Sequence, residues 1–224
     1  KPVYSNFNIN IHVASEALEP RPFQPIIIGV DQSGIHPAAV ILQNINGTWC
    51  VLDELYADNE GFENFLHGML IPLLRGRYST NPLVAAIDPS NTRDSWQGAV
   101  TPKQRFADAG IKAVTELTNN PRVRIQTVEH MLNQRAGGLL IDPACKMLIR
   151  GFSHEYRYRK LRASGTMGSV YTPSPEKNDA SHVHDALQYA ALLIQRGDNM
   201  DKDTTMQNVR DELIRRRSSL SSVV

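Results

Sequence analysis

The sequence predicts a mixed-sheet α/β domain, and three observations lead to this class. Two uninterrupted apolar runs, at residues 25–31 and 83–88, are bounded by turn-forming residues, which is typical of strands buried on both faces of a sheet. The dipeptide Asn46-Gly47 joins two further apolar runs and is a strong hairpin signal. After residue 60, helical and extended patterns alternate, so helices and strands should be interleaved.

The expected elements can be placed in order along the chain. We expect strands at residues 25–31, 38–44, 48–56, 83–88 and 111–114. We expect helices at residues 60–74, around 102–109, from 121 to about 136, and from about 181 to 195. Residues 139–150 should form a strand, a turn led by Pro143 and a further helix. The first three strands should be antiparallel, and the later elements should extend the same sheet.

Composition narrows the class of protein. A chain of 224 residues with 41% hydrophobic content can form one domain with a sizeable core. The formal net charge is +1, so any contact with DNA would have to come from a local basic patch. Cys50 and Cys145 lie in apolar contexts without zinc-ligand spacing, and we expect reduced, buried thiols. No apolar run approaches the length of a membrane span, so no membrane contact is expected.

Three aspartates are the main candidates for chemistry. Asp31 and Asp88 end the two apolar runs, and Asp185 begins an amphipathic helical stretch. A carboxylate at the end of a buried strand is costly without a partner, and Mg²⁺ or Mn²⁺ prefers such oxygen ligands. Each residue also has a structural interpretation. Asp88 could form a turn before Pro89, and Asp185 could interact with a helix dipole.

Other polar residues near the aspartates are secondary candidates for an outer-shell or phosphate contact. They are His182, His184, Lys177, Asn178, Ser33, Ser90, Asp53 and Glu54. Asp53 and Glu54 alternate on one strand, so one of them could point toward the site. For each of these residues an ordinary role in a loop, strand or helix start remains open.

Residues 154–171 are rich in Tyr, Arg and Lys around Gly165 and Gly168, which predicts an exposed basic hairpin. The candidate DNA-binding residues are Arg157, Arg159, Lys160, Arg162, Tyr156 and Tyr158. Such a ribbon can follow phosphates without reading base sequence. The alternative is a solvated edge hairpin whose charges prevent aggregation.

Four segments, in this order, resemble a known family. They are Gly29–Gly34, Ala86–Ser90, Cys145–Ile149 and Pro175–Tyr189. Together they are similar to the C-terminal nuclease domain of the large terminase subunit of tailed bacteriophages, which belongs to the ribonuclease H-like superfamily. The resemblance covers roughly residues 1–196. It implies a ribonuclease H-like mixed central sheet flanked by helices, with an extra basic β-hairpin.

The resemblance also implies an activity. A domain of this family is a metal-dependent endonuclease that cuts double-stranded concatemeric viral DNA during genome packaging, with little sequence specificity. In that family, carboxylates at the positions of Asp31, Asp88 and Asp185 are catalytic and hold two Mg²⁺ or Mn²⁺ ions. We expect Asp31 to bridge both ions because its strand should lie centrally. Two ions support hydrolysis by activating water and stabilising the leaving oxygen.

Domain organisation and partners are expected to follow the same family. Residues 1–24 would be a linker from an upstream ATPase domain, 25–197 the nuclease domain, and 198–224 a charged, partly disordered tail with a short helix at 205–217. The sequence contains no GxxxxGK[ST] motif, so no ATP site is expected in this chain. Expected partners are double-stranded DNA, the ATPase domain, the portal and the small terminase subunit. The expected location is the cytoplasm of the infected bacterial host.

Two other classes of function stay open from the residues alone. One is a noncatalytic DNA-binding or motor-assembly module in which the aspartates are structural. The other is a different ribonuclease H-like enzyme, such as a resolvase, a transposase or a sugar- or acetate-kinase-like phosphotransferase. Divalent-dependent plasmid nicking would separate the nucleases from the assembly module and the phosphotransferase.

Overall fold

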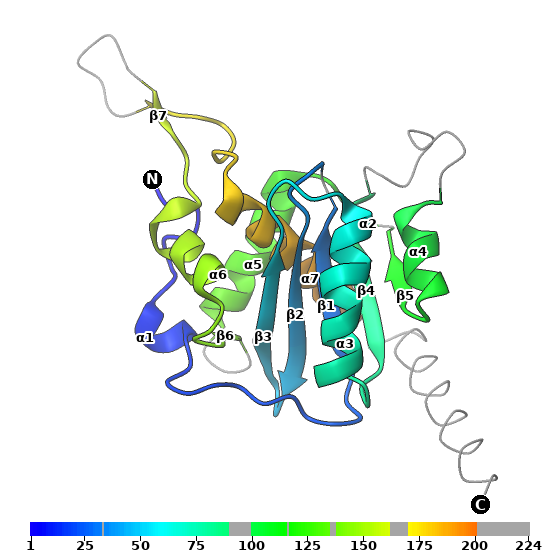
Figure 1. Ribbon diagram of the computed structural model, residues 1–224. Helices are drawn as coiled ribbons and strands as arrows, with labels where there is room; N and C mark the ends of the chain where they lie inside the picture. Colours follow the sequence, from blue (N-terminus) through cyan, green and yellow to red (C-terminus); the bar gives the residue numbers. More distant parts are fainter. Residues whose placement is uncertain (33, 90–99, 116, 135–137, 162–169, 201–224) are drawn as a thin grey trace, which may run out of the picture.

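The protein is built on a central six-stranded sheet. The computed structural model describes residues 1–32, 34–89, 100–115, 117–134, 138–161 and 170–200. The strand order is β5-β4-β1-β2-β3-β6 (Figure 1). The strands are β1 (Ile26–Asp31), β2 (Ala38–Ile45), β3 (Thr48–Tyr56), β4 (Leu83–Ile87), β5 (Lys112–Val114) and β6 (Leu139–Ile141). β1, β2 and β3 pair antiparallel, whereas β4, β5 and β6 each join a neighbour in parallel.

The turn between β2 and β3 has the conformation that its sequence predicts. Asn46 has φ 54° and Gly47 has φ 87°, which are positive values at both central positions. These angles are required by the type I′ turn that favours Asn-Gly. The side-chain oxygen of Asn44 accepts a hydrogen bond of 2.9 Å from the amide of Gly47. The predicted antiparallel hairpin is therefore confirmed.

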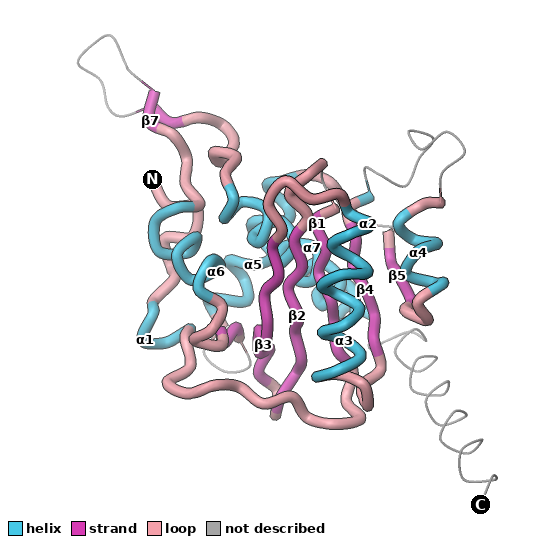
Figure 2. Tube along the Cα trace, in the orientation of Figure 1, coloured by secondary structure: helices cyan, strands magenta, loops and turns pink. Residues whose placement is uncertain are grey.

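Helices cover both faces of the sheet (Figure 2). They are α1 (Ile9–His12), α2 (Phe62–Phe65), α3 (Ile71–Arg77), α4 (Pro102–Asp108), α5 (Pro121–Asn133), α6 (Lys146–Arg150) and α7 (Asp179–Met200). Two π-helical turns, η1 (Leu66–Leu70) and η3 (Gly151–Glu155), continue α2 and α6. Pro72 has no amide hydrogen for a regular helical bond, and the widened turn η1 precedes it.

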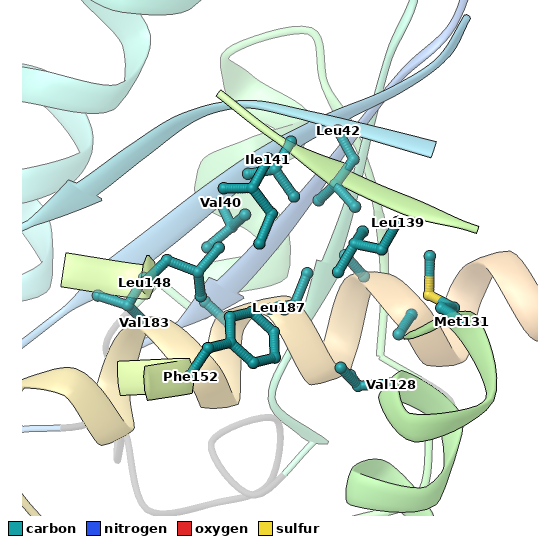
Figure 3. Packing of buried hydrophobic residues seen from close by; sticks show 14 of the residues in the cluster. Val40, Leu42, Val128, Met131, Leu139, Ile141, Leu148, Phe152, Val183 and Leu187 are labelled. Carbon is teal, nitrogen blue, oxygen red and sulfur yellow. The ribbon is translucent and has the colours of Figure 1, made fainter. Parts of the chain in front are cut away.

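Each face of the sheet has its own apolar core. On one face, Val40 and Leu42 pack against residues of α5 and α7, including Val128 and Leu187 (Figure 3). On the other face, strand residues pack with Phe65 and neighbouring residues of α2, η1, α3 and α4. Alternation along β1 explains the division, because Ile27 belongs to the first core and Ile26, Ile28 and Val30 belong to the second.

Helix α7 crosses β1 at unusually short range. A Cβ atom on Gly29 would lie 2.0 Å from the carbonyl oxygen of Ala186 and 2.9 Å from the Cβ of Ala190. Only glycine can occupy this crossing without moving the helix. The start of α7 is fixed by Asn178, whose side-chain oxygen accepts from the Ser181 amide at 3.0 Å, while the Ser181 hydroxyl accepts from the Asn178 amide at 3.1 Å.

The first residues of the chain pack on this framework. Val3 and Tyr4 are buried, and the Val3 amide donates to the Tyr156 carbonyl at 3.1 Å. Val13 forms a β-bridge with Ile141. The assignment of residues 1–24 to a linker between domains stays a prediction, as does the boundary at residue 197. The predicted tail helix at 205–217 lies outside the described residues.

The described part of the predicted basic hairpin begins later in the chain than expected. The described ladder pairs β7 (Lys160–Leu161) with β8 (Val170–Tyr171), and residues 151–155 are helical. Tyr156 is only 4% exposed and belongs to the core, so its assignment to a DNA-binding face was wrong. Tyr158 also packs against that core. The tyrosines therefore anchor the strand while Arg157, Arg159 and Lys160 remain exposed.

The fold class is confirmed as a mixed α/β arrangement with antiparallel strands first and parallel strands after them. The expected strands and helices are present, with ends shifted by a few residues. Cys50 and Cys145 are free and buried, as predicted. Within the described residues, no helix has the length and apolar character needed to cross a membrane.

Candidate active site at the ends of β1 and β4

The three candidate aspartates lie at the same end of the sheet. β1 and β4 are parallel neighbours in register, with Val30 opposite Ile87, so Asp31 and Asp88 emerge side by side. Both point toward α7, since Gly29 and Ala86, two residues earlier, contact that helix. Asp185 lies on α7 next to Ala186, the residue that meets Gly29. The three carboxylates are 2%, 8% and 4% exposed in chain order.

The charges of all three carboxylates act on the hydroxyl group of Tyr189. Burial raises the pKa of its hydroxyl well above the usual value; the nearby Arg124 cation lowers it, and the charges of Asp88, Asp185 and Asp31 raise it further. Tyr189 follows Asp185 by one helical turn, and its hydroxyl donates to the side-chain oxygen of Asn119 at 2.9 Å. One side chain on α7 is thus within electrostatic reach of residues from three separate elements.

Asp185 is held by two cations. Its Oδ1 lies 3.3 Å from Nη2 of Arg124, and its Oδ2 contacts Nζ of Lys177. Burial raises the pKa of the Asp185 carboxyl, Arg124 and Lys177 lower it, and Asp31 raises it. Arg124 lies on α5, and its guanidinium stacks 4.7 Å from the ring centre of Tyr189. Positive charge from both sides therefore offsets only part of the electrostatic cost of burying Asp185, and its pKa stays above the ordinary value.

Asp31 is contacted by a histidine from α7. Nδ1 of His182 lies 2.9 Å from Oδ2 of Asp31. The His182 ring stacks with those of His36 and Tyr56 at centroid distances of 5.5 and 6.3 Å. The Tyr56 hydroxyl in turn donates to Asp179 at 2.9 Å. This row of rings fixes one side of the site and connects β3 to the first turn of α7.

Gln32 links the ends of the two strands. Its side-chain amide donates to the backbone carbonyl of Asp88 at 3.0 Å, and the residue is 3% exposed. The bond holds the segment after β1 against the segment after β4. Gln32 therefore positions the two carboxylates that these segments carry.

Three of the secondary candidates lie elsewhere, which corrects the expectation for them. Asp53 pairs with Arg77 at 2.9 Å and also contacts Tyr78. Glu54 accepts 2.7 Å hydrogen bonds from the amides of Met147 and Leu148, so it caps α6. His184 is fully buried among Tyr4, Phe152 and Tyr156, away from the carboxylates. Strand alternation places Asp53 on the sheet face opposite α7, beside Ile41, and helix rotation directs His184 away from the site.

The remaining candidates divide between the site and the undescribed segments. Lys177 and His182 contact site aspartates, and Asn178 caps α7. Arg157 pairs with Glu176 at 3.3 Å, and Arg159 lines a hollow of about 520 Å³ that also includes Lys177. Ser33, Ser90 and Arg162 lie outside the described residues.

Sequence reasoning missed Arg124 and Gln32. Arg124 lies one turn before Val128 on the apolar face of α5, and an arginine within such a stripe is a detectable signal for a buried anion. Gln32 offered only a weak signal, since a polar residue directly after a strand is ordinary. The target of its hydrogen bond depends on which strand lies beside β1, and this neighbour follows β1 in the chain by more than fifty residues.

The donor set suits a hard divalent cation in chemistry, because it consists of three carboxylates carried by neighbouring elements. Within the described part of the chain, no three His, Cys, Asp or Glu side chains are grouped closely enough to hold one ion as they stand. The oxygens of Asp31 and Asp185 instead contact His182, Arg124 and Lys177. The carboxylates of Asp31 and Asp185 are therefore paired with basic groups of the protein.

Comparisons with known proteins address the fold. Neither protein-family models nor curated protein sequences match the chain. Among solved structures, the large terminase of a thermophilic bacteriophage is similar, with a TM-score of 0.64 and 20% identity over 86% of this chain. The match covers 45% of that terminase, so this chain spans under half of its length.

Two isolated nuclease domains match over nearly their whole length. The P22 large terminase nuclease domain has a TM-score of 0.59 and 14% identity, covering 87% of this chain and 92% of its own. The large terminase nuclease of thermophilic phage G20c, a structure with bound magnesium, has a TM-score of 0.53 and 14% identity, covering 84% and 96%. The chain therefore shares its fold with phage large terminase nuclease domains.

Proposed function

We propose that this chain is a divalent-metal-dependent endodeoxyribonuclease, the nuclease domain of a phage large terminase. The observation that carries the proposal is the placement of Asp31, Asp88 and Asp185 at the same end of the sheet by β1, β4 and α7. The fold shared with terminase nuclease domains supports the same assignment. The G20c nuclease with bound magnesium supports Mg²⁺ as the ion, and Mn²⁺ has the same preference for oxygen ligands.

The three aspartates, which end β1, follow β4 and lie on α7, would hold the ions. When bound, two such ions activate a water molecule and stabilise the leaving oxygen of the phosphodiester. The protein's own contribution is positioning. Arg124 holds Oδ1 of Asp185, His182 holds Oδ2 of Asp31, and Gln32 ties the two strand ends together.

DNA would enter along the strand that carries Arg157, Arg159 and Lys160. These side chains are exposed, so they suit sequence-independent attraction to phosphates. The hollow lined by Arg159 also includes Lys177, which contacts Asp185. A duplex bound there would have a backbone phosphate close to the carboxylates.

In the infected bacterial cytoplasm, we propose, the domain cuts concatemeric viral DNA during packaging. It would act within a longer polypeptide that includes an ATPase domain, together with the portal and the small terminase subunit. The longer large terminase of the thermophilic bacteriophage, of which the matched part is 45%, supports such an arrangement.

The decisive experiment is cleavage of supercoiled plasmid with Mg²⁺, Mn²⁺ or EDTA. We expect cutting that needs the metal and that falls at least about 100-fold in Asp31→Asn or Asp185→Asn, because each removes a charge the ions require. Asp108→Asn is the matched control, since Asp108 is exposed at the end of α4 and should cut normally. Full metal-dependent cutting by the Asp31 or Asp185 variant would refute the assigned site.

The basic strand can be tested separately by charge reversal. We expect Arg157→Glu combined with Arg159→Glu to weaken duplex binding and to lower the dependence of binding on salt, because fewer counterions are then released. Fluorescence anisotropy over a series of salt concentrations measures both quantities. Reversal of Arg75, a surface residue on α3, serves as the control. Unchanged binding and salt slope in the double variant would remove this strand from the DNA interface.

A further inference from the structure

We propose that Lys177 occupies the oxygen of Asp185 that a divalent ion would bind, so that loading of the ion requires release of this lysine. The inference rests on the proposed function. It assigns Lys177 a role in setting the metal affinity of the site, beyond the three carboxylates themselves.

The two cations on Asp185 differ in how firmly they are held. The side chain of Arg124 is 7% exposed, and its guanidinium is fixed by the ring of Tyr189 at 4.7 Å. The side chain of Lys177 is 69% exposed and reaches Asp185 from the loop before α7. Arg124 is therefore a permanent partner of Oδ1, while Lys177 is an exchangeable partner of Oδ2.

The chemistry of the two side chains agrees with this division. A guanidinium is planar, stays charged and suits buried ion pairs, whereas an ammonium is a compact point charge on a flexible stem. An ion pair with an exposed partner contributes little net stability, so the cost of opening the Lys177 contact is small. A divalent cation brings twice the charge of the ammonium to the same oxygen.

The released side chain of Lys177 can move into an adjacent hollow. Lys177 lines the hollow of about 520 Å³ with Arg159, Thr172, Ser174, Pro175, Glu176 and Asn178. The hollow opens beside the exposed basic strand, so a phosphate of bound DNA would lie within reach of the same ammonium. Because Asn178 caps α7, the backbone at this point stays fixed while the side chain moves.

The test is calorimetric titration of Mn²⁺ into the metal-free protein at mildly alkaline pH. The matched pair is Lys177→Met, which removes the charge and keeps the length, and Lys146→Met at an exposed position on α6. We expect Mn²⁺ to bind Lys177→Met about two- to fivefold more tightly than wild type, the range set by a partly exposed ion pair. Lys146→Met should match wild type, and far-UV dichroism verifies that all three are folded.

The possible results separate the inference from the proposed function. Equal affinities in wild type and Lys177→Met, or weaker binding in the variant, would overturn the inference while the nuclease assignment stands. Absence of Mn²⁺ binding in all folded proteins would overturn both. Cleavage is not needed for any of these conclusions.

Lysine reactivity provides a second measurement on wild-type protein. Brief acetylation with a succinimidyl ester, quantified by mass spectrometry, reports how accessible each amine is. We expect Mn²⁺ to raise the labelling of Lys177 at least about twofold relative to Lys146, because the ammonium leaves its carboxylate partner. Unchanged labelling of Lys177 at saturating Mn²⁺ would contradict displacement.

Discussion

Two histidines two residues apart on α7 occupy opposite environments. His182 contacts Asp31 at 2.9 Å, and its side chain is 15% exposed at the edge of the site. His184 is fully buried against Tyr156, and the two ring centres lie 4.7 Å apart. Neither ring nitrogen of His184 makes a well-formed hydrogen bond, and the polar group that acts on the ring is the backbone of Leu148. One side of the helix therefore contacts the carboxylates, and the other side packs in the core.

The difference follows from helix geometry. Residues two apart on a helix project about 200° apart, so both cannot face the same element. His182, Asp185 and Tyr189 point to the strand ends, whereas His184 and Gln188 point to Tyr4 and Tyr156. Proximity in sequence to a functional aspartate is thus a poor guide to function, and the side of the helix is a good one.

The largest effect is expected from moving α7 itself. Gly29→Ala should reduce cleavage by about 100-fold, because its methyl group would lie within 2.0 Å of the Ala186 carbonyl and displace Asp185. The unfolding free energy should fall by roughly 1–3 kcal/mol. Plasmid cleavage and urea denaturation measure these changes.

The matched control is Gly76→Ala on α3, where a methyl group would meet no atom within 4 Å. It should be neutral or slightly stabilising, since alanine favours helix. Normal cleavage by Gly29→Ala would show that the short crossing does not set the geometry of the site.

The next largest effect is expected from His184, on the side of α7 that packs in the core. Burial lowers the pKa of His184 to about 3, whereas in the unfolded chain it binds a proton near its ordinary value of 6.5. The unfolded state therefore gains a proton first, and the free energy of unfolding should fall as pH drops below about 6.5, by up to about 1.4 kcal/mol per pH unit. Urea denaturation between about pH 7 and pH 5 measures the slope before most carboxylates titrate.

His184→Phe should remove this part of the slope and leave cleavage near wild type, because the residue does not face the aspartates. His154→Gln is the control, since the His154 side chain is 67% exposed and should leave the slope unchanged. An undiminished slope in His184→Phe would assign the pH effect to another group.

The smallest effect is expected from His182, on the side of α7 that contacts the carboxylates. His182→Gln should lower cleavage by about tenfold with little change in melting temperature, because it weakens the group that orients Asp31. Cleavage rates at saturating Mg²⁺ measure the loss, and His184→Phe provides the contrast. If the two variants exchanged their effects, the assignment of the two sides of α7 would be reversed.

Much of the fold could be predicted because its signals are local. The apolar run of β1, the Asn46-Gly47 turn and the first turn of α7 each carry their own residue pattern. The positions of Asp31 and Asp88 at strand ends could be read directly, since strand ends are set by the residues that follow. The burial of Tyr156 could not be predicted, because its neighbours Arg157 and Arg159 indicate an exposed strand.

The sequence by itself determined the class of sheet, the order of its elements, the two carboxylates that follow the apolar runs of β1 and β4, and the third on α7. Only the tertiary structure decided which groups meet those carboxylates. Arg124 and His182 reach them from α5 and α7, and Lys177 reaches them from the loop before α7. Gln32 instead binds the backbone carbonyl of Asp88. The physical reason is that periodicity fixes the face on which a side chain lies, whereas long-range packing, here permitted by Gly29, fixes what that face meets.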